Sequence, residues 1–158
     1  MVYSTDGDIF QCSENIIVHQ VNCKGVMGAG IAKCIAQRFP RTISPYKVQC
    51  NKFGASNLGH ALIVQGHSGR TKYEHKFIAH VFGQNNFGRD YNVTYTDYDS
   101  LKNGLVEVEQ FAAKHNLTVA IPYGIGCNLG GGEWFTVRSK IYEVFGDSPV
   151  KAVIYKHI

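Results

Sequence analysis

The feature that most constrains the fold is a glycine-rich run, VNCKGVMGAGIA at residues 21–32, that directly follows an apolar segment. The apolar residues 16–21 (IIVHQV) are typical of a β-strand, and residues 30–38 are typical of a helix. Glycines let a backbone come close to a ligand, and the free amides at a helix start attract anions. The run therefore predicts a strand, a phosphate-binding loop and a helix in succession.

A second run, IPYGIGCNLGGGEW at residues 121–134, repeats this arrangement with Glu133 near the start of the helix that follows. Two ordinary tight turns are the alternative interpretation of the pair. Because both runs follow an apolar strand, they indicate two loops that grip a diphosphate from opposite sides.

Strands and helices alternate along the chain. Short apolar segments rich in β-branched or aromatic residues predict strands at 16–21, 61–65, 77–82, 118–121 and 150–155. Helical patterns occupy residues 30–38, 42–52, 97–115 and 132–145, and Thr96 or Asp97 can cap the third helix. The alternation predicts an α/β sandwich, in which ligands bind outside the carboxyl ends of the strands.

Composition limits the classes of protein to which the chain can belong. A chain of 158 residues fits one domain over residues 1–158, and no stretch of about 18 apolar residues suggests a membrane segment. The amino terminus lacks the pattern of a signal peptide, so we expect a soluble, cytoplasmic protein. The five cysteines show no CxxC spacing, and the seven histidines form no HxH or HExxH pair, so free thiols and no metal are expected. The cysteines are Cys12, Cys23, Cys34, Cys50 and Cys127.

The net charge is +4, and the one dense basic stretch, GRTKYEHK at residues 69–76, lies where a solvated turn is expected. A nucleic-acid partner is therefore not expected. A mildly positive field would still favour encounter with a small anionic ligand.

The motifs and their order resemble those of macrodomains over nearly the whole chain. GDIF at residues 7–10, the two glycine loops and the terminal VIYKHI fall in the matching order. HQVNCKGVMGAGIA and the following RFP resemble the branch that contains ADP-ribose-1''-phosphate phosphatases and terminal ADP-ribose glycohydrolases. The resemblance implies a three-layer α/β/α sandwich around a mixed, mostly parallel sheet, and ADP-ribose binding without a cofactor.

The resemblance also implies binding roles. Asp8 matches the acid that accepts a hydrogen bond from the adenine amino group, with the Ile9 amide on a ring nitrogen, although Asp8 could simply close a turn. Tyr155 matches the aromatic position that packs on adenine, and a core tyrosine is the alternative. Asn22 matches an asparagine on the distal ribose, and a turn-forming asparagine is the alternative. Backbone contacts to the phosphates and ribose are expected from Gly28, Ala29, Gly30, Ile31, Ile125, Gly126, Cys127, Asn128, Leu129 and Gly130.

Catalytic residues are less well indicated. His19 matches a histidine of the phosphatase branch that could move a proton beside Asn22, yet alternation places it with apolar neighbours, where a buried structural histidine is equally expected. Gln84 and Gly130 stand where glycohydrolases of this branch have a lysine and an aspartate, which disfavours a lysyl-adduct mechanism. A nucleophilic Cys127 is disfavoured because no histidine is near in sequence. Arg89 could contact a terminal phosphate, although a solvated loop arginine is more common.

Three functions follow from this interpretation. The leading expectation is an ADP-ribose-binding hydrolase that removes a distal-ribose substituent such as the phosphate of ADP-ribose-1''-phosphate. A non-catalytic reader or sink for ADP-ribose or a related NAD-derived signal is the alternative from another class. A third candidate releases ADP-ribose from ADP-ribosylated macromolecules without a catalytic lysine.

Overall fold

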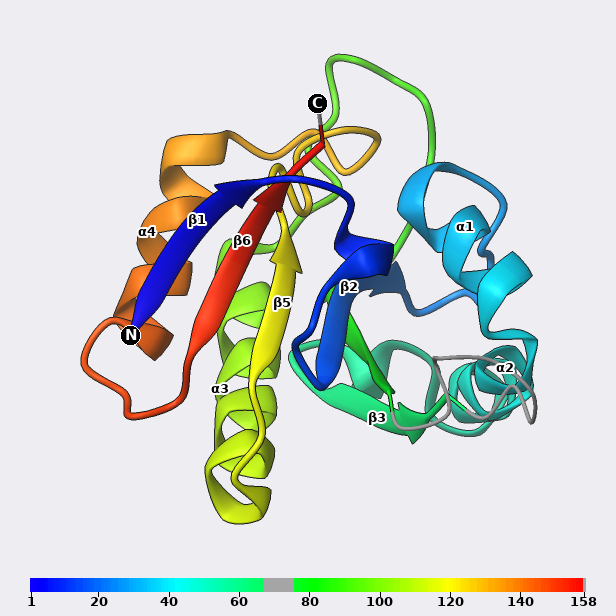
Figure 1. Cartoon of the computed structure of the whole chain (residues 1–158). Helices are drawn as coiled ribbons and strands as arrows, with labels where there is room; N and C mark the ends of the chain where they lie inside the picture. The colour runs from blue at the N-terminus through cyan, green and yellow to red at the C-terminus, as the bar shows by residue number, and fades with distance from the viewer. Residues whose placement is uncertain (67–75, 158) are drawn as a thin grey trace.

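The computed structural model describes residues 1–66 and 76–157. Six strands form one sheet in the order β1-β6-β5-β2-β4-β3. They are β1 (Val2–Asp6), β2 (Ile16–Asn22), β3 (Ala61–Gln65), β4 (Phe77–Gln84), β5 (Val119–Pro122) and β6 (Ala152–Lys156). Only β3 among the described strands runs antiparallel to its neighbour. The mixed, mostly parallel sheet expected from the resemblance is confirmed (Figure 1).

Helices cover both faces of this sheet. They are α1 (Gly30–Arg38), α2 (Ile43–Phe53), α3 (Tyr98–His115) and α4 (Trp134–Phe145). Figure 1 shows α3 and α4 behind the strands, whereas α1 and α2 lie toward the β2–β3 end. Three single-turn helices, η1 (Ile9–Gln11), η2 (Pro40–Thr42) and η3 (Gly54–Asn57), complete the described elements.

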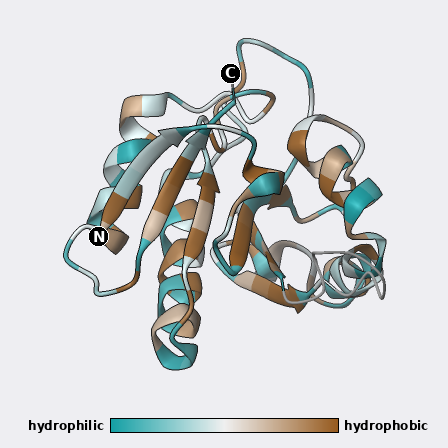
Figure 2. Ribbon diagram, in the orientation of Figure 1, coloured by the Kyte–Doolittle hydropathy of each residue, from teal (hydrophilic) through white to brown (hydrophobic). Residues whose placement is uncertain are grey.

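The alternating side chains of β2 divide the core between the two faces. Ile16 and Val18 pack with α3 and α4, whereas Ile17 packs with α1 and Val21 with α2. All four side chains are buried, which explains why the segment reads as a continuous apolar run. Figure 2 shows the same hydrophobic character along the central strands.

One strand was missing from the sequence prediction, and several helix and strand boundaries differ from it by one or two residues. Strand β1 is an edge strand whose side chains are mostly exposed, so it lacks the apolar signal of a buried strand. Helix α4 begins at Trp134 rather than residue 132, because the Glu133 carboxylate accepts hydrogen bonds from the amides of Phe135 and Thr136 and caps the helix. Asp97 caps α3 by accepting from the Ser100 amide, as one of the two expected caps.

Within the described ranges, no helix combines the length and apolar character needed to cross a membrane. The basic stretch at residues 69–76 falls outside those ranges except for Lys76, whose ammonium donates to the Cys12 carbonyl at 2.8 Å.

Candidate functional site

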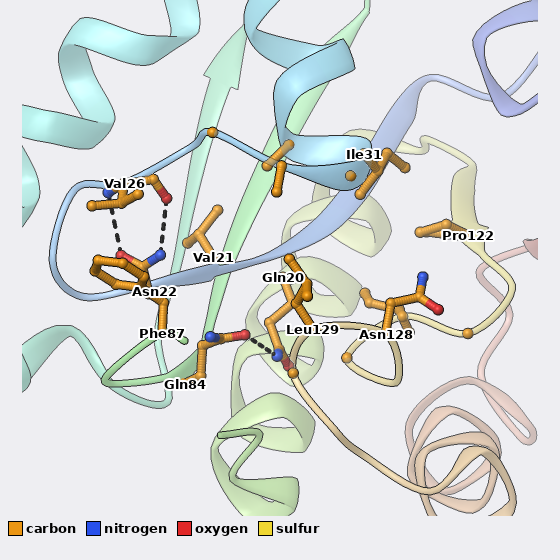
Figure 3. Close-up of a pocket in the computed structure, with 18 of the residues that line it drawn as sticks. Gln20, Val21, Asn22, Val26, Ile31, Gln84, Phe87, Pro122, Asn128 and Leu129 are labelled. Carbon is orange, nitrogen blue, oxygen red and sulfur yellow. Dashed lines mark hydrogen bonds between the residues drawn. The ribbon is translucent and has the colours of Figure 1, made fainter. Parts of the chain in front are cut away.

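A cavity of about 540 Å³ opens at the carboxyl ends of β2 and β5, between the two glycine-rich loops (Figure 3). This is the edge where ligands of α/β proteins bind, and the volume suits a small-molecule ligand. Its lining residues are Gln20, Val21, Asn22, Val26, Gly28, Ala29, Gly30, Ile31, Ala32, Gln84, Phe87, Gly88, Arg89, Pro122, Tyr123, Gly124, Ile125, Gly126, Asn128, Leu129 and Gly130.

Asn22 closes the first loop. Its Nδ2 donates to the Val26 carbonyl at 2.9 Å, and its Oδ1 accepts from the amides of Lys24 at 2.9 Å and Val26 at 3.3 Å. The pairing of β2 with β4 is irregular between Val21 and Asn22, which places Asn22 at the point where the chain leaves the sheet. Asn22 therefore has the turn-forming role that the sequence left open, and it lines the cavity at the same time.

Helix α2 contacts this loop through the side chain of Tyr46. The Tyr46 hydroxyl donates to the Asn22 carbonyl at 2.7 Å and lies 3.1 Å from Asn22 Oδ1. The Tyr46 side chain is fully buried, and its ring stacks on Phe82 with centroids 5.9 Å apart. The Asn22 side chain is thus held by the backbone of its own loop and by the buried hydroxyl of Tyr46.

The start of α1 presents backbone to the cavity. Its cap residue, Ala29, makes no side-chain hydrogen bond to the first turn, and Gly30 has a φ of +58°. A Cβ added at Gly28 or Gly30 would meet nothing within 4 Å, because both positions face open space. The first-turn amides of an α-helix lack partners within the helix, and Gly30, Ile31 and Ala32 of this turn line the cavity.

The second loop is a tightly packed turn. The Cys127 amide donates to the Gly124 carbonyl at 2.9 Å, and the Gly132 amide donates to the Gly126 carbonyl at 2.9 Å. A Cβ at Gly130 would lie 2.5 Å from Thr96 Oγ1 and 2.6 Å from the Gly126 carbonyl oxygen. A side chain at Gly130 would therefore force the loop apart.

A row of polar side chains behind the loops was missed in the sequence. Gln20 Nε2 donates to Gln84 Oε1 at 2.7 Å and to Thr96 Oγ1 at 2.8 Å, and Thr96 Oγ1 donates to the Gly126 carbonyl at 2.7 Å. This network joins β2, β4 and the second loop. Gln20 is a polar residue within a mostly apolar strand, a signal that could have identified it.

The segment after β4 reaches the cavity with Phe87, Gly88 and Arg89. The amides of Tyr95 and Thr96, at the far end of this segment, donate to the Gly130 carbonyl at 2.8 and 3.0 Å. The second loop therefore anchors the segment after β4. Phe87 and Asn22 are both labelled among the lining residues in Figure 3. Arg89 is the one lysine, arginine or histidine among the described lining residues, and it lies exposed at the edge of the cavity.

The residues expected at the adenine lie beside the cavity rather than in its lining. The Asp8 carboxylate accepts from the Phe10 amide at 2.9 Å and caps η1, and Ile9 is buried in the core next to it. The Tyr155 hydroxyl donates to the buried carboxylate of Glu14. Tyr155 is also joined to the cavity edge, because its carbonyl accepts from the amide of the lining residue Tyr123 at 2.8 Å.

His19 is fully buried and does not contribute to the described lining. Its Nε2 lies 2.7 Å from Nδ1 of His80 on the adjacent strand, which is also fully buried. Burial, followed by the neighbouring His80, lowers the pKa of His19 well below its usual value, and burial lowers the pKa of His80 to about 4. Both rings are therefore neutral at pH 7, and the structural alternative for His19 matches this location.

Cys127 contributes backbone to the second loop, while its Sγ turns toward the Ile125 carbonyl at 3.4 Å. Burial, with a smaller contribution from the Glu133 charge, raises the pKa of the thiol to about 11. The thiol is protonated at neutral pH, which agrees with the expectation that Cys127 is not a nucleophile.

The fold and the cavity together define an α/β protein with a cavity walled by two glycine-rich loops. The chain belongs to the Macro domain family, whose model matches residues 18–141.

Relatives with named activities lie in two groups. The chain is 28% identical to a DNA ADP-ribosyl glycohydrolase of Mycobacterium tuberculosis over 98% of its own length and 42% of the relative. It is 29% identical to an ADP-ribose 1''-phosphate phosphatase of Meyerozyma guilliermondii, covering 78% of this chain and 76% of that protein. The chain thus spans about two fifths of the mycobacterial relative.

Among solved structures, the macrodomain of Mycobacterium tuberculosis DarG matches with a TM-score of 0.81 and 25% identity, over 98% of this chain and 97% of that one. The three-layer fold and the family expected from the sequence motifs are both confirmed.

Proposed function

We propose that this chain binds ADP-ribose in the large cavity and hydrolyses a phosphate monoester at the 1'' position of the distal ribose. The observation that carries the binding is the pair of facing backbone loops, since a diphosphate fits a site built from helix-start amides and glycines. The name of the fungal relative favours the phosphate monoester as the bond cleaved.

The ligand is proposed to lie along the carboxyl edge of the sheet. Asn22 and the segment at Phe87 would face the distal ribose, and the two loops would hold the diphosphate. Adenine would extend toward Asp8 and Tyr155, which the hydrogen bonds to Phe10 and Glu14 fix in place. The backbone link between Tyr123 and Tyr155 supports a continuous path from the cavity to that end.

The proposed reaction transfers the phosphoryl group to water. The water oxygen bonds to phosphorus, the bond from phosphorus to the 1'' oxygen breaks, and the water proton passes through the phosphate oxygens to the departing oxygen. Transition states of this kind are loose and depend on positioning and charge more than on a strong base. Asn22 and the first-loop amides would orient the reactants, and Arg89 would balance phosphate charge.

His19 is not given a direct role in this scheme. Its ring lies inside the core against His80, so it would act on the site only through the position of β2.

A non-catalytic role in ADP-ribose recognition is the second candidate, and a specific observation favours it. The described lining residues include no carboxylate, imidazole, amine or thiol. A site without these groups suits a reader or a sink as well as a slow hydrolase.

Release of ADP-ribose from DNA is the third candidate, favoured by the name of the mycobacterial relative. Gln84 occupies the position where the resemblance places a lysine, and Gln20 holds its side chain by a hydrogen bond. A reaction through a lysyl adduct is therefore not proposed.

The test combines calorimetric titration with ADP-ribose and two turnover assays. One measures phosphate release from ADP-ribose-1''-phosphate, and the other measures release of ADP-ribose from an ADP-ribosylated oligonucleotide. The proposal expects binding, phosphate release from ADP-ribose-1''-phosphate, and loss of release in Asn22→Ala. Arg41→Ala, which changes an exposed residue outside the described lining, serves as the control and should retain activity.

The outcomes separate the candidates. Binding without release of phosphate or of DNA-linked ADP-ribose would favour the reader, and release from an ADP-ribosylated oligonucleotide alone would favour the third candidate. Absence of ADP-ribose binding would overturn the proposed function altogether.

A further inference from the structure

Tyr46 lies outside the described lining of the cavity, yet its hydroxyl contacts a lining residue at two atoms. The side chain is fully buried on α2, and the hydroxyl lies 2.7 Å from the Asn22 carbonyl oxygen and 3.1 Å from Asn22 Oδ1. Burial raises the pKa of this hydroxyl, so it stays protonated and can donate at neutral pH. The hydroxyl therefore links α2 to the residue that closes the first loop.

The contacts of Asn22 decide which of its atoms can meet a ligand. Its Oδ1 accepts from the amides of Lys24 and Val26 and from the Tyr46 hydroxyl, so three donors surround an oxygen with two lone pairs. Its Nδ2 carries two hydrogens, and the Val26 carbonyl is its one partner among the described residues (Figure 3). Because backbone amides only donate, these contacts fix which end of the side-chain amide is the oxygen. Asn22 can therefore offer a ligand a hydrogen-bond donor but no free acceptor.

Tyr46 ties this arrangement to the core. Its ring stacks on Phe82 of β4, with centroids 5.9 Å apart, and lies 5.5 Å from the ring of His80 on the same strand. The other described partners of the Asn22 side chain belong to the loop that Asn22 itself closes, so they move with it. Of the described partners, the Tyr46 hydroxyl alone comes from another element, and it holds the amide in place relative to the sheet.

We propose that Tyr46 is a positioning residue that holds Asn22 as a hydrogen-bond donor to an oxygen of the distal ribose. This inference rests on the proposed function, which places the distal ribose beside Asn22. ADP shares the adenosine and the diphosphate of ADP-ribose but lacks this ribose. Loss of the Tyr46 hydroxyl frees the Asn22 amide to turn, so the contact to the distal ribose is lost while the contacts of the two loops to the diphosphate remain.

The experiment compares calorimetric titrations of wild type and Tyr46→Phe with ADP-ribose and with ADP. The substitution removes one oxygen atom and keeps the ring that packs on Phe82 and His80. The affinity for ADP-ribose should fall about tenfold, which corresponds to about 1.4 kcal/mol, and the affinity for ADP should stay within about twofold of wild type. An equal fall for both ligands would show that Tyr46 supports the whole site rather than the Asn22 amide, and would overturn the inference.

A double variant tests whether Tyr46 acts through the Asn22 side chain. Asn22→Ala removes Oδ1 and Nδ2, so adding Tyr46→Phe should cause no further fall in the affinity for ADP-ribose. The melting temperature should still fall, because the hydroxyl also donates to the backbone carbonyl of residue 22, which Asn22→Ala keeps. A further tenfold fall in affinity in the double variant would mean that Tyr46 acts by another route, contrary to the proposed role.

Thr42→Val is the matched control. Thr42 is also fully buried, and its hydroxyl donates to the Phe39 carbonyl at 2.9 Å, outside the described lining. The change removes one buried hydroxyl and its hydrogen bond, as Tyr46→Phe does, but leaves the contacts of Asn22 in place. It should lower the melting temperature and keep the wild-type affinities for ADP-ribose and ADP. A selective loss of ADP-ribose affinity in Thr42→Val would assign the effect to general stability and reject the role of Tyr46.

The same titrations separate this inference from the proposed function. Failure of the wild-type protein to bind ADP-ribose would contradict the proposed function itself. Wild-type binding of ADP-ribose that Tyr46→Phe retains in full would reject the role of Tyr46 and leave the proposed function intact.

Discussion

At the scale of single residues, the first loop has two glycines, Gly28 and Gly30, whose backbone conformations differ. Gly28 and Gly30 both face open space in the cavity, but only Gly30 has a left-handed φ, +58°. The effect of a methyl group in the cavity and the effect of backbone strain can therefore be separated by substituting alanine at Gly28 and at Gly30.

We expect Gly30→Ala to lower the free energy of unfolding by about 1 kcal/mol, because a Cβ is disfavoured at left-handed φ. Gly28→Ala is the matched control and should leave stability nearly unchanged. Both methyl groups would project into the cavity, so both variants should weaken ADP-ribose binding by about tenfold. Denaturant titration and calorimetry measure the two effects, and equal destabilisation by both variants would contradict the assignment.

At the scale of elements, strands β2 and β4 meet through a buried pair of histidines. His19 and His80 lie opposite each other in the parallel register, and the Tyr46 ring of α2 lies 5.5 Å from the His80 ring. His19 Nδ1 and His80 Nε2 have no hydrogen-bond partner among the described residues, so protonation would place a charge where little compensates for it.

This pair predicts a pH dependence of stability. Burial lowers the pKa of His80 from 6.5 to about 4, so below pH 6.5 the unfolded chain binds more protons than the folded one. The free energy of unfolding should therefore fall as pH drops from 6.5 to 4, by roughly 3 kcal/mol at about 1.4 kcal/mol per unit. His80 should contribute no pH dependence above that window.

Denaturant titration across pH 4–8 measures this contribution. His80→Gln should remove the His80 share of the slope between pH 4 and 6.5 and leave the share that buried His19 contributes, and His157→Gln, at an exposed position, should retain the full slope. An unchanged slope in His80→Gln would show that other groups cause the loss of stability.

At the scale of the whole molecule, the cavity joins segments that are distant in the chain. Asn22 and Gly30 come from the first part of the chain, and Gly126 and Gly130 from near its end. A ligand held between the two loops stabilises only the folded arrangement that brings them together, so binding and global stability are linked.

Saturating ADP-ribose should consequently raise the melting temperature. At a free ligand concentration of 100 times Kd the stabilisation is about 2.7 kcal/mol, which corresponds to a rise of about 5–10 °C for a chain of this size. Differential scanning calorimetry measures the rise, with ribose 5-phosphate as a control ligand that cannot span both loops. A rise equal to that of the control would argue against a ligand that bridges the cavity.

The sequence by itself determined the α/β alternation, both glycine loops and a helix cap at Thr96 or Asp97, because strand and helix periodicity, glycine and capping residues act locally. The structure selected Asp97 of the two. The family followed from motif order and was confirmed. Tertiary structure decided what depends on residues far apart in the chain. It added the exposed edge strand β1, placed His19 against His80, and joined Gln20 to Gln84 and Thr96. No local pattern encodes these pairings, since each arises only when the sheet order brings its strands together.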